Sequence, residues 1–256
     1  MKNIEKIEKI ILKFIEPWSK RNEFEGVLLT GSFMTGFANK YSDIDIHIVM
    51  NNDFKYKEKG LKKVDGYLIE YFLNPINEIL NYFKEDYYKN RSNAATQFLT
   101  GKILIDRNNN IRYLKDQAKK WKKIKFKKIQ ALDIELIKYK IIDDADNLKG
   151  LFITKDKSFE INFYLFLYSI YKDYSLFIGN EIISPSKLLV YLNNPKLSKV
   201  LFLKDFKDKI FKKIILKALN SNKNNKIIII NEMVDYVIHK MGGFNRKNWN
   251  YKIKLR

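Results

Sequence analysis

Two aspartates separated by one isoleucine, Asp43 and Asp45, interrupt a run that otherwise has the character of a buried strand. They alternate with Ile44, Ile46 and Ile48, and this period of two places both carboxylates on the same strand face. Adjacent carboxylates repel, and burying them unpaired is costly. A divalent cation removes this cost, because Mg²⁺ prefers oxygen ligands and is commonly held by one or two carboxylates together with phosphate oxygens. The pattern therefore predicts a metal site.

A glycine–serine pair, Gly31-Ser32, precedes the aspartates by ten intervening residues. The pair ends a short apolar run predicted to be a buried strand, 27–30, and opens a predicted short helix, 33–37. Glycine lets the backbone approach a phosphate closely, and the N–H groups at a helix start, with the Ser32 hydroxyl, can bind anionic oxygens. A phosphate site beside a metal site is what attack on the α-phosphate of a nucleoside triphosphate (NTP) needs, with two ions able to activate the attacking oxygen and stabilise the leaving one.

A third carboxylate belongs near the first two, and Glu70 is the best candidate for it. It lies in Tyr-Leu-Ile-Glu-Tyr-Phe, an otherwise apolar predicted strand. If this strand pairs beside the strand of Asp43 and Asp45, Glu70 completes a set of three metal-binding acids. The competing interpretation is a solvent-facing hairpin residue. Asp65 is the nearest alternative acid, but its place before Gly66 is explained by turn chemistry.

The combination resembles the DNA polymerase beta-type nucleotidyltransferase superfamily: Gly-Ser, ten residues, Asp-Ile-Asp on a strand, and a later strand carboxylate. The resemblance covers residues 24–73 and implies two-metal transfer of a nucleotidyl group with release of pyrophosphate. It assigns Gly31 and Ser32 to the phosphate loop, Asp43 and Asp45 to the metal pair, and Glu70 to the third acid. The strand and helix patterns along the chain predict an α/β fold, in which a small mixed-sheet nucleotidyltransferase domain (1–120) precedes an all-α helical-bundle domain (121–256). This layout is similar to that of antibiotic nucleotidyltransferases for kanamycin and lincosamides, so a role in antibiotic resistance is one possibility.

In those antibiotic enzymes a carboxylate from the helical half serves as general base for the acceptor hydroxyl. The stretch Lys-Ile-Ile-Asp-Asp-Ala-Asp-Asn-Leu offers Asp143, Asp144 and Asp146 beside an apolar stripe. Asp144 is our candidate for a base or an outer metal-site residue. The simpler interpretation of each of the three is a solvated helix charge that pairs with Lys140 or Lys149.

Three further residues are weaker candidates for substrate contacts. Lys40, in the connection after the glycine–serine pair, and Lys102, before the last predicted strand, could neutralise the triphosphate, although lysine is abundant in this chain. His47 shares a strand face with the aspartates and could contact substrate, but a strand histidine with its hydrogen bonds satisfied is the simpler account.

Local patterns predict the elements that position these residues. In the first half they are a helix from residue 4 that stops at Pro17, strands at 27–30 and 44–48, a hairpin of 61–64 and 67–73 around Asp65-Gly66, a helix at 76–88, and a short strand at 103–105. A lysine-rich segment, 119–128, leads into the second half. There, helical patterns cover 134–148, 159–178, a start at Ser184-Pro185, 204–219 and 227–241, with a polar loop at 220–225.

Composition bounds the remaining possibilities. The 256 residues are 46% apolar, enough for a real core, and no run of about eighteen uncharged apolar residues predicts a membrane span. The absence of cysteine excludes disulfides and thiolate metal sites, and two histidines make a histidine-built zinc site a poor fit. We see no secretory signal and expect a cytoplasmic protein. The net charge of +20 attracts phosphates, although a chain rich in Lys, Asn and Ile also fits an A/T-rich coding background. The oligomeric state is not predicted.

Three hypotheses of function follow. The first is a Mg²⁺-dependent nucleotidyltransferase that uses an NTP, with ATP expected, to modify a hydroxyl of a small molecule. The second keeps this chemistry and makes the acceptor RNA, such as a tRNA 3′ end, or a protein; the basic charge favours it. The third is a non-catalytic basic module that binds RNA or nucleotide, against which the three acids argue.

Overall fold

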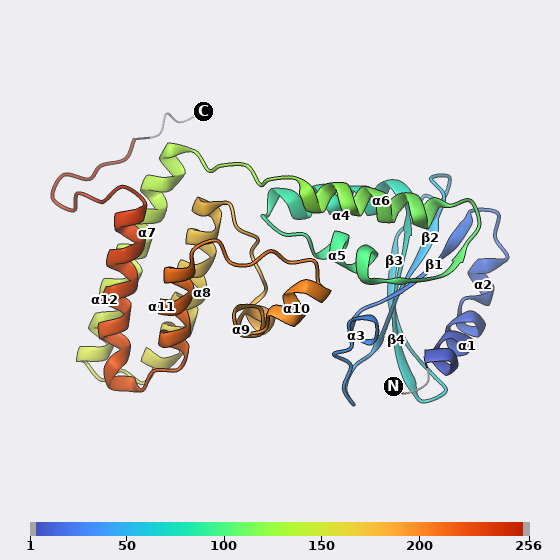
Figure 1. The fold of residues 1–256 in the computed structure, drawn as a ribbon, viewed down its shortest axis with the longest axis horizontal. Coiled ribbons are helices and arrows are strands. Elements are labelled where there is room, and N and C mark those ends of the chain that lie inside the picture. The colour runs from blue at the N-terminus through green and yellow to red at the C-terminus, as the bar shows by residue number, and fades with distance from the viewer. Residues whose placement is uncertain (1–3, 253–256) are drawn as a thin grey trace. The chain divides into compact units, whose positions relative to one another are not determined.

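The computed structural model describes residues 4–252, and the chain forms two compact units (Figure 1). The first unit contains the chain up to Lys125 together with Lys196–Lys204, which includes most of the short helix α10 (Pro195–Val200). The second contains Phe126–Pro195 and the residues that follow from Asp205.

A mixed five-stranded sheet in the order β3-β4-β2-β1-β5 forms the centre of the first unit. The pair β2–β4 is parallel, and the other three neighbouring pairs are antiparallel. The strands are β1 (Phe24–Thr30), β2 (Ile44–Met50), β3 (Glu58–Val64), β4 (Tyr67–Pro75) and β5 (Lys102–Asp106). The α/β fold class expected from the sequence is confirmed.

The hairpin of β3 and β4 closes through Asp65-Gly66, as the sequence predicted. Both turn residues have positive φ, 47° for Asp65 and 83° for Gly66, which is the requirement of the tight two-residue turn that matches the strand twist. The turn sets the register of the whole hairpin, so that Leu61 lies opposite Glu70 and Lys59 opposite Phe72.

Helices cover the two faces of the sheet (Figure 1). On one face, α1 (Ile4–Phe14) and α2 (Glu16–Ser19) pack with inward residues such as Ile44, Ile46 and Ile48 of β2. On the other face lie α4 (Ile76–Tyr88), α5 (Asn93–Thr100) and α6 (Asn110–Lys123), against Leu28 of β1 and Val49 of β2. Asp45 and His47 alternate with the isoleucines of β2 and therefore belong to this second face.

Several predicted helix boundaries in the first unit were wrong or incomplete. The N-terminal helix ends at Phe14, and Pro17 lies in the first turn of α2, where its missing N–H costs no helical hydrogen bond. Neither α5 nor α6 was predicted. In α6 the basic side chains in the last turn, among them Lys122 and Lys123, obscure the buried stripe of Ile111, Leu114 and Ala118.

The second unit consists of helices around an aromatic core that includes Phe163, Tyr171, Tyr174 and Phe211. The helices are α7 (Ala131–Ile153), α8 (Phe159–Ile178), α9 (Pro185–Asn193), α11 (Lys209–Leu219) and α12 (Lys223–Lys240). The contacts of α7 with α8 and α12, and of α11 with α8 and α12, make it a bundle. Tyr171 is fully buried, so at this position the aromatic pattern of α8 serves the core.

Two helix starts in the bundle differ from the sequence-based expectation for a shared reason, which is side-chain capping. The helix predicted from 204 begins at Lys209, because the Asp208 carboxylate accepts hydrogen bonds from the Ile210 and Phe211 N–H groups, both at 3.0 Å. The polar loop predicted at 220–225 is shorter, because Asn222 caps α12 in the same way. Ser184 precedes Pro185 at the start of α9 as predicted, but its hydroxyl makes no capping bond.

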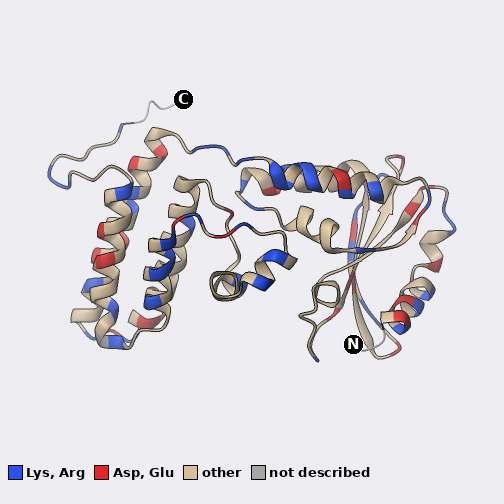
Figure 2. Cartoon of the chain, viewed as in Figure 1, with Lys and Arg blue, Asp and Glu red and all other residues tan. Residues whose placement is uncertain are grey.

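The basic side chains are distributed over both units, with dense runs along α6 and α11 (Figure 2). None of the helices within residues 4–252 combines the length and the apolar character that a bilayer crossing requires.

Candidate active site

Three carboxylates converge at one end of the parallel pair β2–β4. Asp45 and Glu70 are direct register partners, and Asp43 stands one residue before β2. One oxygen from each of the three side chains lies within 4.8 Å of the others, and all three residues are half-buried. The parallel pairing explains the convergence, because it brings Glu70 beside Asp45 on the same sheet face although 25 residues separate them in the chain.

Gly31 lies directly against this cluster. It follows β1, whose last residue, Thr30, pairs with Asp45. A Cβ added to Gly31 would lie 1.8 Å from Asp45 Oδ2, and the residue has a φ of 75°. Only glycine tolerates both the positive φ and this close approach of a carboxylate. The position joins the glycine–serine turn to the acid cluster in one site.

Ser32 begins the short helix α3 (Ser32–Thr35). Its Oγ is buried and has no hydrogen-bond partner among the described residues. A buried hydroxyl without a partner is costly, so this atom is suited to a ligand oxygen placed at the turn.

Lys59 belongs to the site and was not among the sequence candidates. Its Nζ lies 2.8 Å from Glu70 Oε1, and its side chain is 64% exposed. The hydrogen bond and charge of Glu70, with smaller contributions from Asp45 and Asp43, raise the pKa of Lys59. The predicted two-residue turn already implied this neighbour, because counting back from Asp65-Gly66 places Lys59 diagonally across from Glu70.

His47 lies two residues beyond Asp45 on the same strand face and is only 6% exposed. Its ring stacks on Phe72 at 5.1 Å between centroids and contacts Phe98 at 5.0 Å. Neither ring nitrogen makes a hydrogen bond of ordinary distance and angle among the described residues, which differs from the satisfied histidine expected from the sequence, although a looser hydrogen-bonding contact with the Gln97 amide acts on the ring. Burial lowers the pKa of His47 to about 4, against the opposing influence of the neighbouring Gln97 amide and of Glu70, and the ring is therefore neutral at pH 7.

The two candidate phosphate lysines have different surroundings. Lys40 is exposed, in the loop between α3 and β2, with its ammonium 4.8 Å from the centroid of the Tyr41 ring. Lys102 instead forms an ion pair with Glu8 of α1. It pairs in register with Leu29, which packs on the face covered by α1. The structure therefore corrects the expectation for Lys102, whose charge lies on the face opposite the acids.

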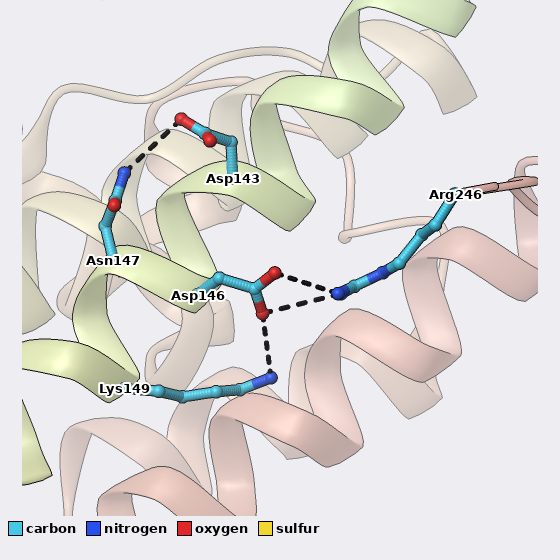
Figure 3. Close-up of polar contacts among 5 residues, drawn as sticks. All are labelled: Asp143, Asp146, Asn147, Lys149 and Arg246. Atoms are coloured by element: carbon cyan, nitrogen blue, oxygen red, sulfur yellow. Dashed lines mark hydrogen bonds and ion pairs between the residues drawn. The ribbon is translucent and has the colours of Figure 1, made fainter. Parts of the chain in front are cut away.

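Two acids of α7, Asp143 and Asp146, bind different partners (Figure 3). Asp146 accepts from Arg246 at 2.8 Å and from Lys149 at 3.2 Å, and Asp143 accepts from the Asn147 amide at 3.3 Å. Burial raises the pKa of Asp144, and Asp143 and Asp173 add to this while Lys140 opposes it. Lys140 itself is paired with the buried Asp173 at 2.7 Å. The pKa of Asp144 is thus shifted in the opposite direction to that of Asp146, where burial is outweighed by hydrogen bonds with Lys149 and Arg246 that lower the pKa.

Three carboxylates beside a glycine-led turn, on a mixed sheet with helices on both faces, define a site of the phosphoryl- and nucleotidyl-transferring class. The family model of the nucleotidyltransferase domain matches residues 7–153, more than half of the chain, and the chain belongs to that family. The resemblance to the polymerase beta-type superfamily is thereby confirmed. The match extends from α1 to the end of α7 and so includes Asp144.

The fold is also similar to that of the nucleotidyltransferase-like protein from Exiguobacterium sibiricum 255-15. The two sequences are 11% identical, the match covers 91% of this chain and 75% of that chain, and the TM-score is 0.47. Among the curated proteins, none matches this chain.

The acid cluster fits a divalent cation. It supplies three carboxylate oxygens, the ligand type that Mg²⁺ prefers, within the small space that one ion bridges. Because Gly31 has no side chain, its backbone can lie directly against the Asp45 carboxylate.

Proposed function

We propose that this nucleotidyltransferase moves a nucleoside monophosphate from an NTP, with ATP as the expected donor, to a hydroxyl of a small-molecule acceptor. The observation that carries the proposal is the convergence of Asp43, Asp45 and Glu70, with Gly31 of the glycine–serine turn directly against Asp45. In this proposal the three acids hold Mg²⁺, with two ions expected. When bound, the metal would offset the negative charge that gathers on the reacting phosphate.

The protein groups have separate tasks in the reaction. Gly31 and Ser32 would hold the phosphates to be released, with the Ser32 hydroxyl donating to a phosphate oxygen, and Lys40 would add positive charge near the loop. The acceptor hydroxyl oxygen bonds to the α-phosphorus, and the bond from that phosphorus to the oxygen bridging to the β-phosphate breaks. Pyrophosphate leaves with that oxygen, and the hydroxyl proton passes to a general base, for which Asp144 is the candidate.

We further propose that residues 1–120 act as the nucleotidyltransferase catalytic domain and that residues 121–256 form a helical C-terminal domain. The raised pKa of Asp144 supports its proposed part, because a carboxyl that holds a proton more readily is a better proton acceptor.

An RNA acceptor is the second candidate. The net charge of +20 and the basic runs on α6 and α11 (Figure 2) favour it, since lysines that neutralise phosphates supply sequence-independent affinity for nucleic acid.

The test is incubation of the chain with each of the four labelled NTPs and Mg²⁺, against small hydroxyl compounds and total RNA. We expect pyrophosphate release with ATP, loss of release in EDTA, and no transfer by Asp45→Asn. Label in total RNA would favour the second candidate. Salt-sensitive RNA binding that Asp45→Asn leaves unchanged, without pyrophosphate release from any donor, would identify a non-catalytic binding module and contradict both.

A further inference from the structure

A cavity of about 600 Å³ lies in the first unit, between the β3–β4 side of the sheet and helices α4 and α5. Its apolar walls include Phe72 and Phe98, and its polar lining includes His47, Asn74 and Gln97. This volume, and the combination of aromatic walls with a few amide and ring nitrogens, are typical of sites for small organic ligands.

The cavity adjoins the acid cluster along two neighbouring strands. His47 and Phe72 are register partners, each two residues beyond an acid, Asp45 or Glu70. At the strand rise this is a separation of about 7 Å along the sheet. Lys59 lines the cavity and also contacts Glu70. A molecule in the cavity could therefore present a group to the acids without leaving its binding site.

His47 indicates that the cavity is built for a ligand with hydrogen-bonding groups. His47 is 6% exposed and lines the cavity. Neither ring nitrogen makes a hydrogen bond of ordinary distance and angle among the described residues, although the Gln97 amide lies close enough to affect the protonation of the ring. A buried imidazole in that condition loses the hydrogen bonds that it makes in water. A ligand hydroxyl or amide restores one of them.

The order of strands in the sheet places the cavity on the side from which the acceptor hydroxyl would attack the α-phosphorus. The glycine–serine turn follows β1, on one side of β2, whereas the cavity lies toward β4 and β3 on the other side. In nucleotidyl transfer the attacking and leaving oxygens lie roughly in line on opposite sides of the phosphorus. If Gly31 and Ser32 hold the leaving phosphates, the acceptor approaches from the side of the cavity.

The charges of the lining indicate a neutral ligand. Lys57 is paired with Glu78 and Lys59 with Glu70, each at 2.7–2.8 Å. Asp86 accepts a hydrogen bond from the Ala94 N–H group at 2.8 Å. Glu58 and Glu85 also line the cavity, so two lysines and three acids give the lining a formal charge of −1. A net charge this small does not strongly select a polycation or a polyanion.

We propose that this cavity is the acceptor site and that it binds a neutral, hydroxyl-bearing small molecule with one flat apolar face. The proposal rests on the proposed nucleotidyl transfer and specifies its acceptor. The aromatic walls take the flat face, His47 and Gln97 bond the polar groups, and one hydroxyl reaches toward Asp45 and Glu70.

The chain has only two histidines, His47 and His239, which makes a direct test possible. Protein labelled with ¹⁵N in histidine is titrated with three probe sets: neutral glycosides and nucleosides, cationic aminoglycosides, and total RNA. Assignment uses His239→Gln. The same probes are assayed for ATP-dependent pyrophosphate release. We expect a neutral compound to shift the His47 signals but not those of His239, and to accelerate release.

The matched variants are Gln97→Leu, which removes an amide from the cavity, and Gln117→Leu on α6, which lies outside the cavity lining. We expect Gln97→Leu to raise the KM for the neutral acceptor about tenfold, the effect of one lost hydrogen bond, and to leave the KM for ATP unchanged. Gln117→Leu should match the wild type in both constants.

The outcomes separate this proposal from the one on which it rests. Label in RNA or in an aminoglycoside, without a shift of His47, would overturn the acceptor site while nucleotidyl transfer stands. A neutral acceptor with equal KM in the wild type and Gln97→Leu would overturn it as well. Absence of pyrophosphate release with every probe would overturn the transfer itself, and the acceptor assignment with it.

Discussion

The two acidic groups of this chain, one on the sheet and one on α7, have similar sequences and opposite arrangements. Asp43 and Asp45 meet Glu70 within 4.8 Å. On α7, Asp143 and Asp146 instead turn to different partners, the Asn147 amide and the Arg246 guanidinium (Figure 3). A strand repeats every two residues and keeps alternate carboxylates together. On a helix, residues two apart, such as Asp144 and Asp146, point about 160° away from each other, because each residue turns the helix by about 100°. The carboxylates on the sheet therefore repel one another unless a cation binds between them, whereas the carboxylates on α7 are each stabilised by a separate partner.

The largest effect that distinguishes the two groups is expected from Asp45→Asn. Removing a carboxylate from the cluster should lower nucleotidyl transfer by about 100-fold or more, since a charged group that the reaction requires is lost. The same change relieves repulsion among the acids, so the variant should unfold at an equal or higher temperature than the wild type in EDTA. Pyrophosphate release and thermal unfolding test the two parts, and an active Asp45→Asn enzyme would remove the sheet acids from the chemistry.

Gly31→Ala is expected to have the next largest effect, with Gly36→Ala as its matched control. Both glycines have positive φ, 75° and 80°, so both substitutions impose backbone strain on the order of 1–2 kcal/mol. Only at Gly31 does the added methyl group meet Asp45 Oδ2, at 1.8 Å; at Gly36 nothing lies within 4 Å. We expect Gly31→Ala to lower activity about tenfold or more beyond Gly36→Ala, through displacement of that carboxylate. Equal activities in the two variants would mean that the close approach has no catalytic importance.

A purely structural acid gives a smaller effect, on stability. Asp208 accepts from the Ile210 and Phe211 N–H groups at 3.0 Å and from the Tyr236 hydroxyl at 2.8 Å. We expect Asp208→Ala to lower the free energy of unfolding by about 2–3 kcal/mol, because a helix cap and buried hydroxyl partners are lost. Denaturant unfolding monitored on α11 and the aromatic core measures it, and a loss well below 1 kcal/mol would contradict the capping role.

The pH dependence of that loss has a definite sign. Burial acts to raise the pKa of Asp208, but hydrogen bonds from Tyr174, the Phe211 N–H group and Tyr236 outweigh it, and the pKa is lowered from its ordinary value of 3.8. A lowered folded-state pKa contributes stability that is present above the unfolded-state value and disappears as pH falls through the folded one. The difference between wild type and Asp208→Ala should therefore shrink below about pH 4. A difference in the free energy of unfolding that grows as the pH falls would contradict the lowered pKa of Asp208.

The smallest effect is expected from Asp146→Asn. Its ion pairs with Arg246 and Lys149 are half-exposed, with the Asp146 side chain 46% accessible. Such pairs contribute less than about 1 kcal/mol each, and salt screens them. We expect a loss of stability below about 1 kcal/mol that decreases in high salt, and unchanged transfer. Asp144→Asn provides the matched comparison. If Asp144 is the general base, Asp144→Asn slows nucleotidyl transfer and Asp146→Asn does not.

Local patterns predicted much of the first unit, because their causes are local. The alternation of isoleucine and aspartate predicted β2, and Asp65-Gly66 predicted the hairpin turn with its two positive φ angles. Helix starts were predicted less well, because the capping bond of Asp208 depends on which polar residue the chain orients toward the free N–H groups. Two of the missed helices, α5 and α6, are short or strongly basic, and their buried stripes are narrow.

The sequence by itself determined which residue types carry the chemistry: two acids in strand alternation, a glycine–serine pair before them, and a carboxylate in an apolar hairpin strand. Tertiary structure decided what these residues meet. The parallel pairing of β2 with β4 places Glu70 beside Asp45, and the hairpin register places Lys59 beside Glu70. Lys102 lies on the face of β5 that α1 covers and therefore pairs with Glu8. Periodicity is a property of the local backbone, whereas strand neighbours and faces follow from how the whole chain buries its apolar side chains.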